Sequence, residues 1–187
     1  MDVIDALYHR RAIRDFTEEA VAKDQINQLI DAAIQAPNAM DEQRWAFVVL
    51  RDRAVLKRIS DEAKNLTLSM MGSAPHLAQF RAFLSQADFN IFYNAPALIV
   101  ICGTEDDPFV EQDCCLAAAN LMLAAHALGL GTCWIGFAEA WLGQAEAKKE
   151  LGIPMPYRPV APIILGHPRA QPQAPERHRP DVVWIGP

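Results

Sequence analysis

The sequence has no block of about five or six lysines or arginines, and its formal net charge is −6. Proteins that bind DNA or RNA present a basic surface to the phosphate backbone, so this composition argues against a nucleic-acid partner. No internal repeat of about 20 to 50 residues occurs, which argues against a solenoid or a propeller. The 187-residue length and 51% apolar content instead predict a globular chain.

Cysteine is scarce, and the four cysteines form neither a CxxC pair nor a zinc-binding spacing. They are Cys102, Cys114, Cys115 and Cys133. Most of them lie in apolar runs, where a free cysteine behaves as a small hydrophobic residue. We predict reduced thiols in a cytoplasmic protein, since the opening MDVIDALYHRR shows no secretory signal.

Long apolar runs are also absent. The longest, between Cys114 and Leu130, is interrupted by Asn120 and His126 and falls short of a membrane span, so we expect no membrane contact. A histidine inside such an apolar helix is usually a hydrogen-bonded core residue, which is the role we predict for His126.

The common catalytic fingerprints are missing. No Walker A sequence, GxSxG elbow or HExxH motif occurs. The glycine-rich stretch 129–136 differs from the dinucleotide-binding GxGxxG motif, because Trp134 replaces the third glycine and because a helix precedes it. Hydrolase and metal-dependent functions are therefore disfavoured.

Stretches with helical and strand periodicity alternate along the chain. Strands are predicted at 45–50, 97–102, 132–135 and 160–165. Helices are predicted at 2–9, 26–34 (with Asp24 as N-cap), 52–64, 111–128 and 139–151. The helix at 111–128 is apolar on all sides, which predicts a central, buried position. The stretch 66–94 is undecided between helix and loop, with a break at 72–75.

This order of elements predicts an α+β fold of mixed layers, in which helices flank a small central sheet. The domain is expected to cover residues 1–168. Residues 169–187 are rich in proline and polar side chains and predict an extended C-terminal arm. Its tip, 182–185, is β-rich and suited to pairing with a strand edge on another chain.

Four separated segments hold the polar residues and glycines that could build a site. They are residues 10–14, 36–45 and 129–136, and the arginines of the arm. Each alone has an ordinary structural explanation, such as surface charge or a helix C-cap.

Together, these segments resemble the nitroreductase family. The family's opening motif appears as Arg10-Arg11-Ala12-Ile13-Arg14-Asp15-Phe16, its A-P-S-x-x-N-x-Q-P-W-x-F motif as residues 36–47, and its A-x-G-L-G-x-C-W-I-G motif as residues 127–136. Asn94-Ala95-Pro96 and Leu165-Gly166-His167-Pro168 also match, in the family's order. The resemblance covers nearly the whole chain.

The resemblance implies a homodimer that binds FMN in a cleft between its subunits. Arg10 and one arginine of the arm, Arg177 or Arg179, would bind the flavin phosphate, with Arg11 beside them, because guanidinium groups pair well with phosphate oxygens. Arg14 would lie at the N1 and O2 edge of the ring, where a cation favours the anionic reduced flavin.

The resemblance also implies contacts to the rest of the ring. The backbone N–H groups of Ile135 and Gly136, which follow Trp134, would reach the N5 and O4 edge, and Gly136 would let the backbone approach closely. The residues implied to reach the flavin from the partner subunit are Pro37, Asn38, Ala39 and Asp41.

Three positions depart from the family's pattern. Ala12 stands where serine is common, so one hydroxyl donor near the phosphate is absent. Asp41 replaces the usual asparagine. Arg44 replaces the usual proline and is expected to add a cation.

The implied reaction has two half-reactions. NADH or NADPH passes a hydride to flavin N5, and a small electron-poor acceptor, such as a nitroaromatic, a quinone or a flavin, then takes it. Because the cofactor carries the chemistry, no side chain is predicted to be catalytic. Two alternatives are open: a relative that uses reduced FMN differently, as in flavin destruction or reductive dehalogenation, and a non-catalytic flavin-binding dimer.

Overall fold

The computed structural model describes residues 2–186. Met1 and Pro187, at the outer ends of the predicted domain and arm, lie outside the described residues. The strands pair antiparallel in one sheet, in the order β1-β2-β4-β3. Their bounds are β1 (Trp45–Leu50), β2 (Ala97–Gly103), β3 (Gly131–Trp134) and β4 (Arg158–Gly166). Each lies within one or two residues of its predicted position.

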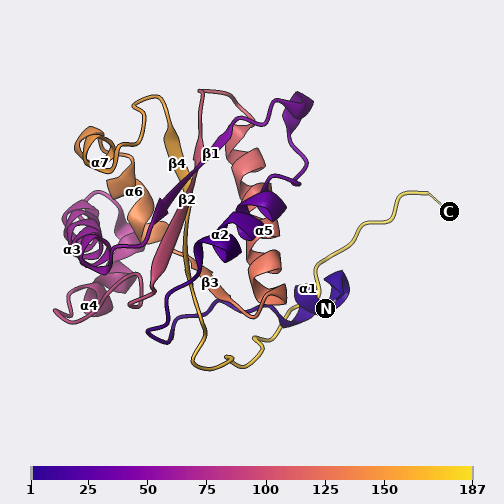
Figure 1. Cartoon of the computed structure of the whole chain (residues 1–187), viewed down its shortest axis with the longest axis horizontal. Coiled ribbons are helices and arrows are strands. Elements are labelled where there is room, and N and C mark those ends of the chain that lie inside the picture. The colour runs from indigo at the N-terminus through magenta and orange to yellow at the C-terminus, as the bar shows by residue number, and fades with distance from the viewer. Residues whose placement is uncertain (1, 187) are drawn as a thin grey trace.

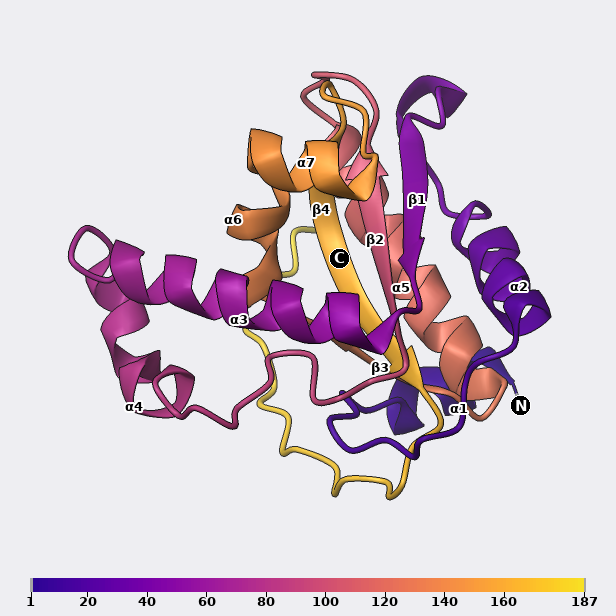
Figure 2. The same cartoon turned by 60° about the vertical axis from the view of Figure 1, so that its left-hand side comes forward.

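Helices cover both faces of this sheet (Figures 1 and 2). On one face lie α1 (Val3–His9), α2 (Lys23–Ala33) and α5 (Val110–Ala127). On the other lie α3 (Arg53–Met70), α4 (Arg81–Leu84), α6 (Glu139–Leu142) and α7 (Ala145–Leu151). This arrangement confirms the predicted fold class, a small central sheet flanked by helices.

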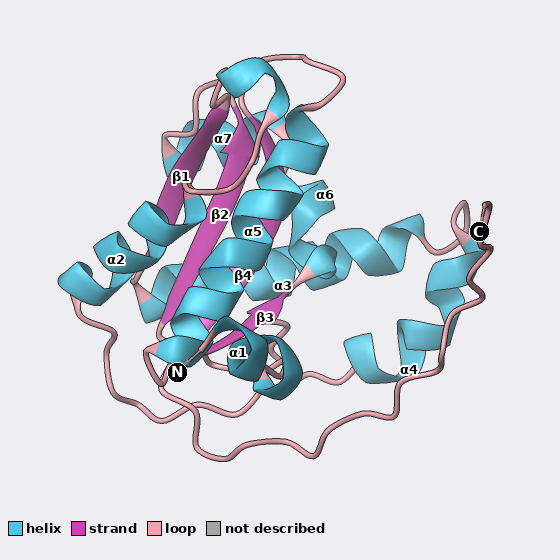
Figure 3. Cartoon of the chain, turned by 90° about the vertical axis from the view of Figure 1, so that its right-hand side faces the viewer, coloured by secondary structure: helices cyan, strands magenta, loops and turns pink. Residues whose placement is uncertain are grey.

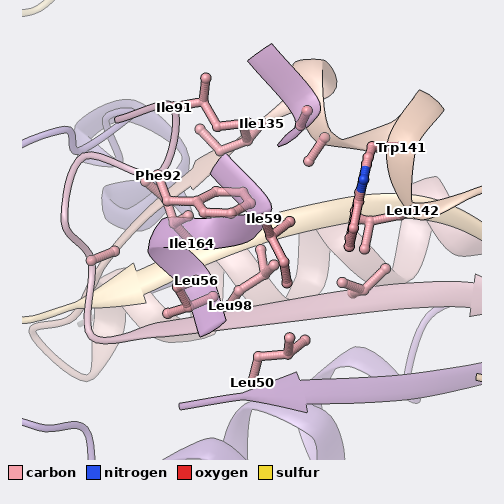
Figure 4. Close-up of a cluster of buried hydrophobic side chains, with 14 of the residues drawn as sticks. Leu50, Leu56, Ile59, Ile91, Phe92, Leu98, Ile135, Trp141, Leu142 and Ile164 are labelled. Atoms are coloured by element: carbon pink, nitrogen blue, oxygen red, sulfur yellow. The ribbon is translucent and has the colours of Figure 1, made fainter. Parts of the chain in front are cut away.

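The alternation of side chains along β2 divides the core between the two faces. Leu98, Val100 and Cys102 join the cluster under α3 and α6, whereas Ile99 and Ile101 join the cluster under α2 and α5. Such a period of two is what an extended strand imposes, and β2 is buried along its whole length because both faces are covered. Figure 4 shows the first cluster, which reaches from Leu50 through Ile59 to Trp141.

Two predicted helix boundaries were wrong. Asp24 lies inside the first turn of α2, and the N-cap is Ala22, whose N–H donates to the Gln25 side chain at 3.0 Å. The single helix predicted at 139–151 is two helices, because the backbone becomes extended at Gln144, which separates α6, with Gly143 as its C-cap, from α7.

Helix α3 is longer than predicted. Asp52 caps it by accepting the N–H groups of Ala54 and Val55, and it continues to Met70 before the predicted break at 72–75. The undecided stretch beyond it contains a short 3₁₀ helix at Pro75–Phe80 and the single turn of α4.

The prediction that α5 is buried on all sides was wrong for the single chain. It buries one face, including Ala117 and Leu121, while Cys115 and Leu116 on the other face are exposed. Helix α1 likewise leaves Ile4 and Leu7 more than half exposed. Figure 3 shows α1 and α5 together in front of the sheet.

An extended segment, residues 10–17, which we call the strap, ties the edge of the sheet to the start of the arm. The Ile13 N–H donates to the Thr132 carbonyl at 2.9 Å, and the Thr17 N–H donates to the His167 carbonyl at 2.9 Å. The strap lies so close to β3 that a Cβ on Gly131 would come within 2.8 Å of the Ile13 side chain. A glycine is therefore required there.

The arm leaves the body past α1 (the yellow segment in Figure 1). Among the described residues, 182–186 are exposed and lie in no strand of the single chain. Pairing of the β-rich tip with another chain stays a prediction. No helix within residues 2–186 combines the length and the apolar character that crossing a membrane requires.

Candidate functional site

The strap carries Arg10, Arg11 and Arg14 between side chains that anchor it in the core. Ile13 and Phe16 are buried in the core, whereas Arg14 is exposed and Arg10 is half-buried. Two neighbouring hollows flank the strap, one beside Arg14 and one beside Arg10.

The first hollow is a mainly apolar pocket of about 320 Å³. Its walls are Arg14 from the strap, the stretch 133–137, Leu77 and the loop residues Phe89, Ile91 and Tyr93. Arg14, Trp134, Ile135 and Gly136 were predicted to share a site, and the structure brings them together. An apolar pocket with one cation in its wall is suited to an aromatic ring that carries a polar edge.

Gly136 borders this pocket at a point where the backbone is open. A Cβ built on it would meet no atom within 4 Å, so the space above it is free for a ligand. Gly136 begins a short 3₁₀ helix, Gly136–Ala138, where the first N–H groups have no partner within the helix.

The role predicted for the Ile135 N–H was wrong. This group donates to the Pro162 carbonyl of β4 at 2.8 Å, which extends the pairing of β3 by one residue. The donor left for a ligand is therefore Gly136, with Phe137 next to it. Ile135 itself is a core residue, as Figure 4 shows.

Tyr93 was not predicted to belong to the site, yet it forms its side wall. The Arg14 guanidinium lies over the Tyr93 ring, 5.8 Å from its centroid. Burial raises the pKa of the Tyr93 hydroxyl above its ordinary value, and the Arg14 charge partly offsets this shift. Tyr93 and Asn94 have φ angles of 52° and 55°, a backbone conformation that costs energy and often marks a functional position.

Aromatic residues extend the wall. Phe137 contacts Phe80 at a centroid distance of 5.2 Å, and Phe83 contacts Phe89 at 4.4 Å. From the sequence, this region could be recognised only as rich in phenylalanine and methionine. Such a composition is equally typical of core packing.

The second hollow, about 210 Å³, lies between the end of α1, the end of α5 and the start of the arm. Arg10, Arg11, His126, Thr132 and Gln171 line it. Burial lowers the pKa of Arg10, and repulsion by Arg11 and Arg177 lowers it further. Arg10 and Arg11 line the hollow and no carboxylate of the described residues does, which is an electrostatic basis for binding an anion.

The partners of these arginines differ. The Arg11 guanidinium donates to the Tyr8 and Arg10 carbonyls, at 2.8 and 2.9 Å, and so caps α1. Within residues 2–186, the Arg10 guanidinium has no carboxylate partner. Both arm arginines, Arg177 and Arg179, are exposed and neither lines the hollow, but the charge of Arg177 acts on Arg10.

His126 is not the satisfied core residue that the sequence predicted. Its Nε2 atom is buried and has no hydrogen-bond partner among the described residues. Burial lowers the pKa of the imidazole, and the charges of Arg10 and Arg11 act in the same direction.

The predicted segment 37–41 lies apart from both hollows. It adjoins the N-terminal end of α5, where the buried Asp113 carboxylate accepts the Ala39 N–H at 3.1 and 3.2 Å. The arginine cluster adjoins the opposite end of this 18-residue helix, about 27 Å away at 1.5 Å per residue. A single chain therefore does not bring Pro37, Asn38, Ala39 and Asp41 to the arginines.

The polar side chains Asn38 and Asp41 of this segment bond to Gln43, which follows it closely in the chain. Asn38 accepts the Gln43 N–H at 3.0 Å, and Asp41 accepts the Gln43 side-chain amide at 3.0 Å. Met40, Asp41 and Gln43 all have φ angles above 50°. The prediction that Arg44 adds a cation was wrong, because Glu42, Asp107 and Glu105 surround its guanidinium.

No group of three or more His, Cys, Asp or Glu side chains within residues 2–186 is placed to hold a metal ion. The site thus consists of an apolar pocket beside a cationic hollow, both built on the edge of an antiparallel sheet.

Known proteins match this chain in sequence and in fold. The model of the Nitroreductase family matches residues 7–167. A protein of Methanothermobacter thermautotrophicus, named "Putative NADH dehydrogenase/NAD(P)H nitroreductase", is 31% identical over 189 residues, which cover 99% of this chain and 87% of the relative. The FMN reductase (NAD(P)H) of Bacillus subtilis is 30% identical over 174 residues, which cover 89% of this chain and 66% of that protein.

The solved structure of an FMN-bound nitroreductase from Bacteroides fragilis has the same fold. It superposes with a TM-score of 0.85 at 21% identity, and the match covers 100% of both chains. The antiparallel sheet and the helices on its two faces thus define a protein of the nitroreductase fold. The family match settles its relationship: this chain belongs to the nitroreductase family.

Proposed function

We propose that this protein is an FMN-dependent oxidoreductase that takes electrons from NADH or NADPH and passes them to small, electron-poor acceptors. The observation that carries the proposal is the pairing of two adjacent hollows, one cationic and one apolar, along a single strap. FMN has the same division, with a phosphate at one end and an aromatic ring at the other. Bound FMN would supply hydride transfer at its N5 atom.

The cationic hollow fits the phosphate. Arg10 has no carboxylate partner among the described residues, and it is repelled by Arg11 and Arg177, so the cluster lacks the negative charge that would stabilise it. A phosphate would provide that charge and accept paired N–H donors from the guanidinium groups. In this proposal Arg10 and Arg177 bind the phosphate, Arg11 caps α1, and Ala12 leaves room beside them.

The apolar pocket fits the ring. Arg14 would hold a positive charge at one edge, where negative charge grows on reduction. Gly136 would offer its N–H at the other edge without a side chain in the way. Trp134 and Ile135 would keep this turn in place through the pairing of β3 with β4.

The proposal includes a homodimer. Exposed apolar residues gather on the elements of one face of the sheet, with Ile4 on α1 and Leu116 on α5 at 56% and 43% exposure. The stretch 37–41, too far from the arginines of its own chain, would then reach the flavin of the partner. The exposed arm 169–186 would add to this interface.

The aromatic wall indicates the class of acceptor. Phe89, Phe137 and Tyr93 offer flat surfaces beside the proposed ring site, which suits stacking of a nitroaromatic or a quinone. Four unpaired cysteines fit a reducing, cytoplasmic compartment.

The test is spectroscopic. The purified protein should carry oxidised-flavin absorbance, lose it on anaerobic addition of NADH or NADPH, and regain it when menadione or a nitroaromatic is added. Absence of any flavin binding would overturn the whole proposal. Flavin that NAD(P)H does not reduce would leave a binding module, and reduction without reoxidation by either acceptor would favour a different use of reduced FMN.

A further inference from the structure

The buried Nε2 atom of His126 has no hydrogen-bond partner among the described residues, and His126 lines the hollow that also holds Arg10 and Arg11. Burying a polar atom without a hydrogen-bond partner costs free energy, because the atom loses its bonds to water. Native proteins rarely keep such an atom unless a ligand, a water molecule or another chain satisfies it.

The neighbouring backbone does not offer His126 a partner. The end of α5 is closed by the Leu128, Gly129 and Leu130 N–H groups, which donate to the carbonyls of residues 124–126. The carbonyl groups at the end of α5 are therefore hydrogen-bonded within the chain, and none of these bonds involves the His126 imidazole.

Several parts of the chain contribute residues to the hollow that His126 lines. His126 lines the same 210 Å³ hollow as Arg10, Arg11 and Thr132. The arm closes the hollow, since the Gln171 amide donates to the His9 carbonyl at 3.1 Å. One acidic side chain, Asp5, acts on His126, but its carboxylate already pairs with His9 at 2.8 Å.

We propose that His126 is a phosphate ligand: its Nε2–H donates to the anion that Arg10 and Arg177 attract, and it thereby selects FMN over flavins that lack a phosphate. This inference rests on the proposed function. It adds a neutral donor from the last turn of α5 to the charged donors of the strap. Ala12 offers no hydroxyl on the strap, so the imidazole provides a donor that the strap lacks.

The experiment compares two flavins that differ only in the phosphate. Flavin-free protein is titrated with FMN and with riboflavin, and dissociation constants are obtained from the quenching of flavin fluorescence. The variants are His126→Ala and His126→Gln, with His76→Ala as a control for loss of an exposed histidine outside the hollow. The readout is the ratio of the riboflavin and FMN dissociation constants.

We expect His126→Ala to weaken FMN binding about tenfold, which equals about 1.4 kcal/mol, and to leave riboflavin binding unchanged within about twofold. His126→Gln, which keeps an N–H donor of similar reach, should recover part of the ratio, and His76→Ala should keep it. Equal weakening of both flavins, or an unchanged FMN affinity, would overturn the role of His126 while leaving the proposed function intact. A wild-type protein that binds neither flavin would overturn the proposed function itself.

The hydrogen bond can also be observed directly. With ¹⁵N-labelled histidine, addition of FMN should shift the His126 Nε2 resonance and protect its proton from exchange, whereas riboflavin should not. Identical spectra with the two flavins would contradict a contact to the phosphate.

Discussion

The guanidinium of Arg14 lies over the ring of Tyr93, with 5.8 Å between the guanidinium carbon and the ring centroid. This contact holds a positive charge at the mouth of the apolar pocket although Arg14 itself is exposed. Cation–π attraction of this kind restricts a long side chain that would otherwise sample many conformations.

Replacement of Arg14 should therefore change the flavin more than it changes the fold. We predict that Arg14→Met lowers the reduction potential of bound FMN by on the order of 30 mV, about 1.4 kcal/mol for a two-electron couple. The reason is loss of a cation beside the reduced, anionic ring. Spectroelectrochemical titration measures it, with Arg81→Met on α4 as a matched control. A potential equal to that of the wild type would place Arg14 away from the ring.

Two glycines on the same edge of the sheet should respond in opposite ways to one added methyl group. Gly131→Ala drives a Cβ into Ile13 and should destabilise the fold by about 1–3 kcal/mol. Gly136→Ala meets no atom, so the stability of the flavin-free protein should hold, while FMN affinity should fall because the methyl group enters the ring site. Urea unfolding and flavin titration of both variants test the pair. Retention of FMN affinity in Gly136→Ala would show that no ligand approaches this backbone.

Asp113 should link the stability of the chain to the stretch 37–41. Its buried carboxylate accepts the Ala39 N–H, so Asp113→Ala leaves that donor unpaired and should cost about 1–3 kcal/mol. Asp113→Asn keeps an oxygen acceptor and should cost less. Urea unfolding of both variants gives the difference, and equal losses would mean that the contact contributes little.

The exposed face of α5 should prove to be the subunit interface. Leu116→Glu places a charge on it and should give a monomer that has also lost FMN, since each site needs both chains. Met155→Glu replaces an exposed apolar residue on the opposite side of the sheet, at 56% exposure, and should stay a flavin-bound dimer. Light scattering coupled to gel filtration distinguishes them. A Leu116→Glu protein that stays dimeric would place the interface elsewhere.

Much of the fold could be predicted because its signals are local. The apolar run at 97–102 needs cover on both faces, and it became the central strand β2. The proline and glycine breaks bounded the helices within a few residues. The end of α6 was not predicted, because a single glycine such as Gly143 does not by itself end a helix; α6 ends because the backbone becomes extended at Gln144.

The site was harder to predict where it depends on long-range pairing. The Ile135 N–H is taken by Pro162, a partner 27 positions along the chain that no local motif indicates. Arg44 is neutralised by Glu105 and Asp107, which only the pairing of β1 with β2 brings close. His126 could not be separated from an ordinary core histidine until its surroundings were known.

The central claim is that one flavin needs the arginine cluster of one chain and the stretch 37–41 of the other. Its most direct test is a mixed dimer of two defective chains, one carrying Arg10→Ala with Arg177→Ala and the other carrying Ala39→Phe. Each homodimer should bind little FMN. The mixed dimer has one site with both defects and one site with none, so we predict one tightly bound FMN per dimer. A mixed dimer without FMN, or an Ala39→Phe homodimer that binds two, would contradict a shared site.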